Sequence, residues 1–151
     1  MTTPAFGRVL TAMVTPMTPA GEVDEAGVVA VAEHLLAHGH DGIVVNGTTG
    51  ESATLTSDES IRVIEIVAGA VGDRATVVAG VGSNDTAHSI AMSRRAAAVG
   101  AAGLLVVTPY YNKPTQPGLV AHFSAIADAT DLPVLLYDIP GRTGIPIQTE
   151  T

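Results

Sequence analysis

The sequence contains no cysteine and no tryptophan. The absence of cysteine excludes disulfide bonds, thiolate zinc sites and a cysteine nucleophile. Aromatic residues are scarce as well, since three tyrosines and two phenylalanines make up 3% of the chain, which leaves no aromatic platform on which nucleic-acid bases could stack. A core with so few rings has to be built from valine, isoleucine, leucine and alanine.

Basic residues are also few. Seven lysines and arginines stand against fifteen aspartates and glutamates, which gives a formal net charge of −8 without a block of like charges. This balance argues against nucleic acid or an anionic membrane surface as a partner. No apolar run approaches the roughly 18 residues that cross a bilayer, and Met1–Arg8 lacks the regions of a secretory signal. We therefore expect a soluble, cytoplasmic protein with no nucleic-acid and no membrane partner.

Short apolar runs alternate with helical patterns along the 151 residues, of which 46% are hydrophobic, and the length favours one domain. The apolar runs predict strands over 9–14, 42–46, 76–80, 103–108 and 133–137. Helical spacing and end signals predict helices over 24–38, 57–71, 85–99 and 118–129, with a further helix beginning in 146–151. The second of these helices follows a capping box formed by Thr56 and Glu59.

Strands that are apolar throughout and separated by helices predict a parallel sheet covered on both faces. Two α/β architectures fit this pattern, a doubly wound open sheet and a (β/α)₈ TIM barrel. The turn after the first strand, Thr15–Gly21, lacks the glycine fingerprint of a dinucleotide-binding fold. The near-constant repeat favours a barrel, which typically needs about 250 residues. We therefore expect residues 1–151 to be the N-terminal portion of a single TIM-barrel domain, with about five strands and four helices.

Polar side chains gather where the expected strands end, which is where parallel α/β folds place their active sites. Glycines flank Thr48 and Thr49 after the second strand, and these hydroxyls with free backbone N–H groups suit a carboxylate or phosphate, although an ordinary polar turn fits equally well. Arg142 in a glycine-flanked loop offers donors for a carboxylate, or is simply a solvated arginine. Hydroxyls brought together can pass a proton, and all three tyrosines follow strands: Tyr110, Tyr111 and Tyr137.

Three histidines lie close enough in the sequence to suggest a metal site, but we do not expect one. His34, His38 and His40 lie close together in the sequence, and three imidazoles can hold a metal ion. They fall at the helix end that faces away from the strand ends, so a solvated helix terminus is the better interpretation. His88 and His122, near the starts of later helices, are interpreted as structural.

Four segments resemble the dihydrodipicolinate synthase (4-hydroxy-tetrahydrodipicolinate synthase) family, in the family's order and spacing: 9–16, 47–51, 108–114 and 137–144. Members are pyruvate-dependent (β/α)₈ lyases that condense pyruvate with aspartate semialdehyde on the lysine and diaminopimelate pathway. The resemblance implies these two molecules as substrates. It covers the N-terminal half of the family's length.

The resemblance also implies roles for particular residues. Thr48, Tyr111 and Tyr137 match a proton relay, in which Tyr137 is the general acid/base. Thr49 matches the residue that binds the pyruvate carboxylate, and Arg142 matches the arginine that receives the carboxylate of the second substrate. In the family the residue at the position of Tyr111 reaches into a neighbouring subunit's site, so a homodimer or homotetramer is expected at full length.

In the family a lysine on the sixth strand forms an imine with pyruvate, so no separate cofactor and no metal is expected. This chain ends at Thr151, before that strand, and its single lysine, Lys113, matches a non-catalytic position. We therefore expect a fragment that is inactive alone. Alternatives are an N-acetylneuraminate lyase-like enzyme or 2-keto-3-deoxy sugar-acid aldolase, which usually vary at the two threonines and at Arg142, and a non-catalytic half-barrel that acts as a binding module.

In feedback-regulated members lysine binds at a dimer interface. Residues of plausible type occupy four matching positions: Ser52, Ala53, Asn84 and Tyr110. Ser57 and Ser60 stand where histidines are usual, and His88 stands where a glutamate would pair with the lysine ammonium. The resemblance therefore implies weak sensitivity to lysine.

Overall fold

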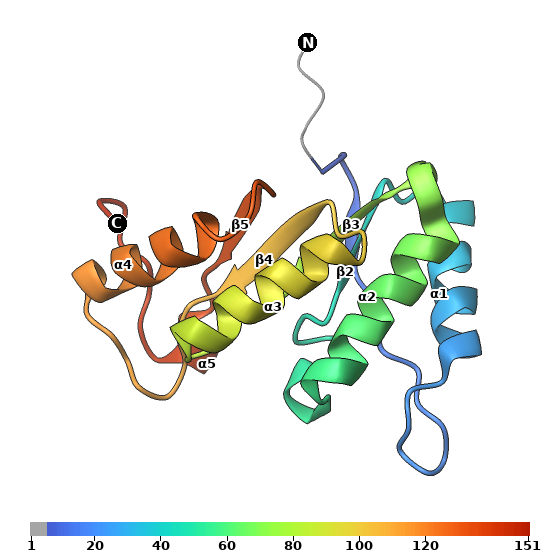
Figure 1. Cartoon of the computed structure of the whole chain (residues 1–151), viewed down its shortest axis with the longest axis horizontal. Helices are drawn as coiled ribbons and strands as arrows, with labels where there is room; N and C mark the ends of the chain where they lie inside the picture. The colour runs from blue at the N-terminus through green and yellow to red at the C-terminus, as the bar shows by residue number, and fades with distance from the viewer. Residues whose placement is uncertain (1–5) are drawn as a thin grey trace.

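The computed structural model describes residues 6–151. Five parallel strands form one sheet in the order of the chain: β1 (Leu10–Ala12), β2 (Gly42–Val45), β3 (Thr76–Gly80), β4 (Gly103–Val107) and β5 (Val134–Tyr137). Four long helices return the chain from each strand to the next (Figure 1): α1 (Glu25–Ala37), α2 (Ser57–Val71), α3 (Thr86–Ala98) and α4 (Gln116–Ala127). The shorter elements are two 3₁₀ turns and one helix: η1 (Ser52–Thr54), η2 (Gly72–Arg74) and α5 (Pro140–Thr143).

Each long helix begins with a side chain that accepts a hydrogen bond from a free backbone N–H group. The capping box predicted for α2 is confirmed, because Thr56 Oγ1 accepts from Glu59 N at 3.2 Å while Glu59 Oε2 accepts from Thr56 N at 2.8 Å. These bonds from Thr56 lower the pKa of the Glu59 carboxyl below its usual value. Asp24, Asp85 and Thr115 cap α1, α3 and α4 in the same way. Caps of this kind contribute about 1 kcal/mol each and define where the loops end.

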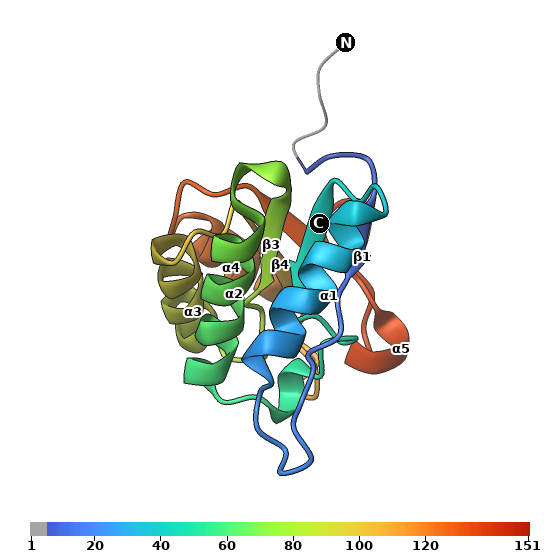
Figure 2. The same cartoon turned by 90° about the vertical axis from the view of Figure 1, so that its right-hand side faces the viewer.

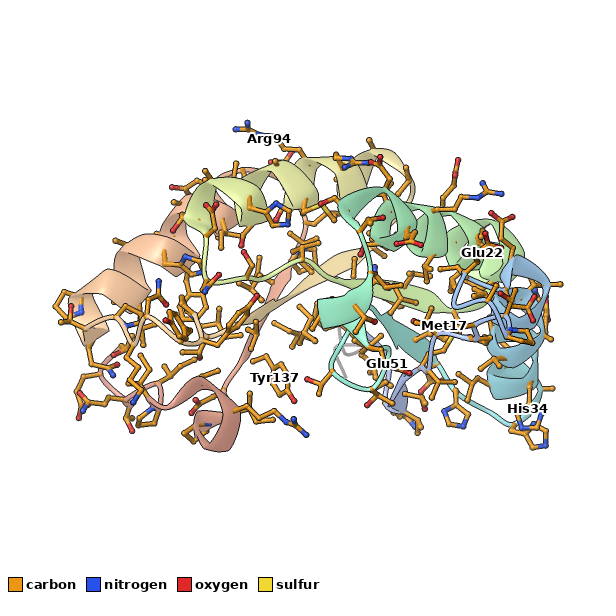
Figure 3. The ribbon with its side chains drawn as sticks, turned by 90° about the horizontal axis from the view of Figure 1, so that it is seen from below. Met17, Glu22, His34, Glu51, Arg94 and Tyr137 are labelled. Atoms are coloured by element: carbon orange, nitrogen blue, oxygen red, sulfur yellow. The ribbon has the colours of Figure 1, made fainter. Side chains whose placement is uncertain are left out.

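All four long helices lie on the same, convex face of the sheet, and neighbouring helices pack side by side (Figures 2 and 3). A doubly wound sheet carries helices on both faces, whereas a barrel wall carries them outside only. The prediction of a TIM barrel is therefore confirmed for this portion. The expectation that both faces are covered is wrong for residues 6–151, since the inner face is concave and bears none of the four long helices.

The core lies between the sheet and the helices. Alternate strand side chains such as Ile43, Val45 and Leu104 are fully buried against the helices. Each such burial stabilises the fold by about 1.5–3 kcal/mol. Leu105 and Val107 have the opposite parity in β4, line the cavity on the concave side and are only half-buried. The two faces of the sheet therefore differ, and the concave face is free to line a cavity.

The predicted strands and long helices agree with the structure to within two residues at each end. Helix α5 was not predicted. The segment 146–151, in which a further helix was expected to begin, ends in a turn where Thr151 N donates to the Gln148 carbonyl at 2.9 Å. Gln116 of α4 holds that segment, because its Nε2 donates to the Pro146 carbonyl at 2.9 Å and its Oε1 accepts from Gln148 N at 3.1 Å. Among the described residues, no helix has the length and apolar character to cross a membrane.

Candidate active site

A cavity of about 410 Å³ lies at the carboxyl ends of β2 to β5, on the concave side of the sheet. The loops after all four strands contribute to its wall, and Leu105 and Val107 form part of its floor. Figure 3 shows Tyr137 and Glu51 on this side, below the layer of helices. The volume is in the range of small-molecule sites. Its position is the one at which parallel β/α folds carry out chemistry.

The loop after β2 is held rigidly at both of its ends. Asn46 is buried in the left-handed conformation (φ 55°), and its Nδ2 donates to the Ser60 carbonyl of α2 at 2.8 Å. At the other end the Gly50 carbonyl accepts from the buried Thr15 Oγ1 at 2.7 Å. Between these anchors Thr48 and Thr49 are both exposed, but Thr48 lines the cavity and Thr49 lies outside the lining. The anchors fix the position at which Thr48 presents its hydroxyl.

Gly80 at the end of β3 permits this loop to lie against the sheet. A Cβ atom on Gly80 would lie 2.1 Å from the Asn46 carbonyl oxygen, far inside van der Waals contact. Only glycine allows the two backbones to approach this closely. The last position of β3 thus determines where the loop with Thr48 can sit.

The ends of β4 and β5 hold two of the tyrosines at the cavity. Tyr137 is half-buried, and its carbonyl accepts hydrogen bonds from the backbone N and the Oγ1 of buried Thr108, at 3.0 and 3.3 Å. Tyr137 and Tyr110 line the cavity. Tyr111 lies outside the lining, is 90% exposed and has a left-handed backbone (φ 72°). The structure therefore places the Tyr137 side chain, but not that of Tyr111, in the cavity wall of this chain.

Helix α5 brings Arg142 to the rim. The Ile139 carbonyl accepts from Arg142 N at 2.8 Å and from Thr143 N at 3.0 Å, which closes the short helix. Thr143 is buried, and its Oγ1 lies 3.0 Å from the Ile145 carbonyl. Arg142 is exposed, lines the cavity and takes part in none of the ion pairs among residues 6–151. Its guanidinium is available for a carboxylate.

Of the five residues predicted for the site, three line one cavity: Thr48, Tyr137 and Arg142. The two that do not are Thr49 and Tyr111. Asn46 and Gly80, which position the site, were not predicted as site residues. The sequence features that could have indicated them are an Asn-Gly pair directly after the second strand and a glycine at the end of the apolar third strand. Hydroxyl groups, among them those of Thr48 and Tyr137, together with the Arg142 guanidinium around a partly apolar cavity suit a small molecule with a carboxylate.

The histidines lie apart from this arrangement, with one exception. The rings of His34 and His38 are 4.1 Å apart on the exposed end of α1, and His40 bonds to Thr11 Oγ1. His88 lines the cavity from α3. His122 is buried beside Thr86 Oγ1 at 2.8 Å, and this burial lowers the pKa of its imidazole. Within residues 6–151, no three His, Asp or Glu side chains are grouped to hold a metal ion.

A wall of parallel strands with helices outside and a polar cavity at the carboxyl ends of the strands defines the chain as part of a (β/α)₈ barrel. Comparison with known proteins identifies which barrel. Residues 5–151 match the Dihydrodipicolinate synthetase family, and the chain belongs to this family.

Relatives agree with this assignment. The chain is 63% identical over 146 residues to the 4-hydroxy-tetrahydrodipicolinate synthase of Acidothermus cellulolyticus, covering 97% of this chain and 47% of that protein. It is 62% identical to 4-hydroxy-tetrahydrodipicolinate synthase 2 of Streptomyces coelicolor, with 97% and 49% covered. The crystal structure of the Cyanidioschyzon merolae enzyme with lysine bound superposes with a TM-score of 0.94 at 50% identity, covering 97% of this chain and 50% of that one. The chain thus spans about half the length of the relatives it matches.

Proposed function

We propose that this chain is the N-terminal part of a 4-hydroxy-tetrahydrodipicolinate synthase, a lyase that condenses pyruvate with aspartate semialdehyde in lysine and diaminopimelate biosynthesis. The observation that carries the proposal is the convergence of Thr48, Tyr137 and Arg142 on one cavity at the strand ends, in a chain of this family. The names of relatives about 60% identical support the same reaction.

Each site residue has a role in this proposal. Tyr137 transfers protons to and from the reacting carbon and oxygen, and Thr48 connects its hydroxyl to that of Tyr111. Thr49 binds the pyruvate carboxylate, and Arg142 binds the carboxylate of aspartate semialdehyde. The exposed ring of Tyr111 supports a site completed by a second copy of the chain, in a homodimer or homotetramer.

The covalent step needs a primary amine. We assign it to a lysine that is not among the 151 residues of this sequence. A lysine amine attacks the ketone of pyruvate, water leaves, and the resulting imine loses a proton to become a nucleophilic enamine. The enamine carbon then attacks the aldehyde carbon of the second substrate. No separate cofactor and no metal takes part. Lys113 lies in an exposed loop outside the cavity lining, and we assign it no part in imine formation.

The test is a steady-state assay of the full-length protein, meaning this chain together with the C-terminal half that its relatives carry. Tyr137→Phe removes a positioned proton donor and is expected to lower kcat about 10²–10³-fold. Tyr110→Phe removes a hydroxyl from the same cavity without touching the proposed relay, and it serves as the matched control with turnover near wild type. Turnover of a 2-keto-3-deoxy sugar acid in place of aspartate semialdehyde would contradict the proposal.

A further inference from the structure

Positive charge is distributed unevenly over this acidic chain. Three arginines of the helical layer bind carboxylates on neighbouring turns or helices: Arg62 with Glu25 and Glu65, Arg74 with Glu33, and Arg95 with Asp58. Arg94 lies on the outer surface of α3, on the opposite side of the molecule from Tyr137 (Figure 3). Among residues 6–151, the segments that follow the carboxyl ends of the strands contain two positive side chains, Lys113 in the loop after β4 and Arg142 in α5 after β5.

A contact between the Lys113 side chain and Gly144 places Lys113 beside the segment that carries Arg142. Lys113 has a left-handed backbone (φ 44°), and its stem crosses Gly144, where an added Cβ would lie 2.8 Å from Lys113 Cε. Gly144 itself has a φ of 81°, so the position is suited to glycine on both counts. Gln116 fastens the two segments together through its hydrogen bonds to Pro146 and Gln148. Neither Lys113 nor Arg142 takes part in an ion pair within residues 6–151.

Lys113 and Arg142 carry positive charge in a chain whose net negative charge repels anions. The formal net charge of the chain is −8, and the loops at the strand ends also carry Glu22, Glu51 and Asp138. Pyruvate is a monoanion, so the chain as a whole repels it. A unit charge some 5–8 Å from an anion in water changes its local concentration by roughly two- to fourfold, and salt screens this effect.

We propose that Lys113 is a substrate-recruiting residue, which together with Arg142 attracts the anionic substrate pyruvate to the rim of the cavity. This inference rests on the proposed function. Lys113 lies outside the cavity lining, so it acts at a distance and not on the reacting atoms. Its contribution therefore falls on KM and kcat/KM for pyruvate, leaves kcat unchanged, and weakens as ionic strength rises.

The test compares three variants of the full-length protein at ionic strengths from about 0.01 to 0.5 M, over which the Debye length falls from about 30 Å to below 8 Å. Lys113→Gln is expected to lower kcat/KM for pyruvate about two- to fourfold at low salt and to match wild type at high salt. Lys113→Arg keeps the charge and is expected to behave as wild type. Arg94→Gln removes the same charge from the outer surface and is expected to leave the salt dependence unchanged.

Two results would overturn the inference while the wild-type enzyme remains active. One is an equal effect of Lys113→Gln and Arg94→Gln, which would show that only net charge matters. The other is a deficit in Lys113→Gln that persists at high salt or is shared by Lys113→Arg, which would assign Lys113 a packing role on Gly144. A wild-type protein that makes no product from pyruvate and aspartate semialdehyde would instead refute the proposed function, and this inference with it.

Discussion

Replacing Gly80 by alanine tests whether the close approach of β3 to the loop after β2 positions the site. The added Cβ would lie 2.1 Å from the Asn46 carbonyl oxygen. Carbon–oxygen contacts normally lie at about 3.3 Å, so the two backbones have to separate by about 1 Å. Because the Asn46 side chain is anchored to Ser60, that displacement is carried into the loop that presents Thr48. Overpacking of this kind costs about 1–3 kcal/mol of stability.

A misplacement of about 1 Å in an active site lowers activity on the order of 10²-fold. We therefore expect Gly80→Ala to reduce kcat/KM of the full-length protein by about that factor and to lower its unfolding temperature. Gly69→Ala is the matched control, since Gly69 is an exposed residue of α2 with no atom within 4 Å of an added Cβ. It is expected to raise stability by about 0.5–1 kcal/mol without changing activity. Gly80→Ala activity within twofold of wild type would refute the reasoning.

Three further predictions concern assembly, pH and regulation. In the 151-residue chain alone, β1 and β5 are open sheet edges and Leu136 is half exposed. We therefore expect this chain to self-associate, to be molten or to be insoluble. A monodisperse monomer in sedimentation that unfolds cooperatively on heating would contradict this. Burial lowers the pKa of His122, so the unfolded state binds more protons below about pH 6.5 and full-length stability falls as pH drops through that value. His122→Asn is expected to flatten that slope in denaturant titrations, and an unchanged slope would exclude His122 as its source. The family resemblance implies a glutamate at the position of His88, so the full-length protein is expected to resist low-millimolar lysine, and half-inhibition below about 1 mM in a steady-state assay would refute this.

The strands and long helices could be predicted because each depends on a local pattern. The bounds of α2 are predicted residue for residue, since Thr56 and Glu59 form its capping box and Gly72 follows it. Helix α5 has four residues, one of them Gly141, and is too short to show a helical period. A helix beginning in 146–151 stays a prediction, and the described part of that segment is a turn in contact with distant Gln116.

The candidate site could be predicted only in part. Thr48, Tyr137 and Arg142 follow strands whose carboxyl ends meet at one edge of the sheet, so their convergence follows from the fold class. Tyr110 and Tyr111 are adjacent and chemically identical, yet one lines the cavity and the other is 90% exposed. That difference depends on the left-handed backbone of Tyr111, which no periodicity in the sequence records.

Borohydride trapping tests the central claim most directly. That claim is that Thr48, Tyr137 and Arg142 belong to an imine-forming site whose reactive lysine is not among residues 1–151. The full-length protein is incubated with pyruvate, reduced, digested and analysed by peptide mass spectrometry. We predict a reduced pyruvate adduct on one lysine beyond Thr151 and none on Lys113, and no adduct when the 151-residue chain is treated alone. An adduct on Lys113, or no adduct on the active full-length protein, would contradict the account.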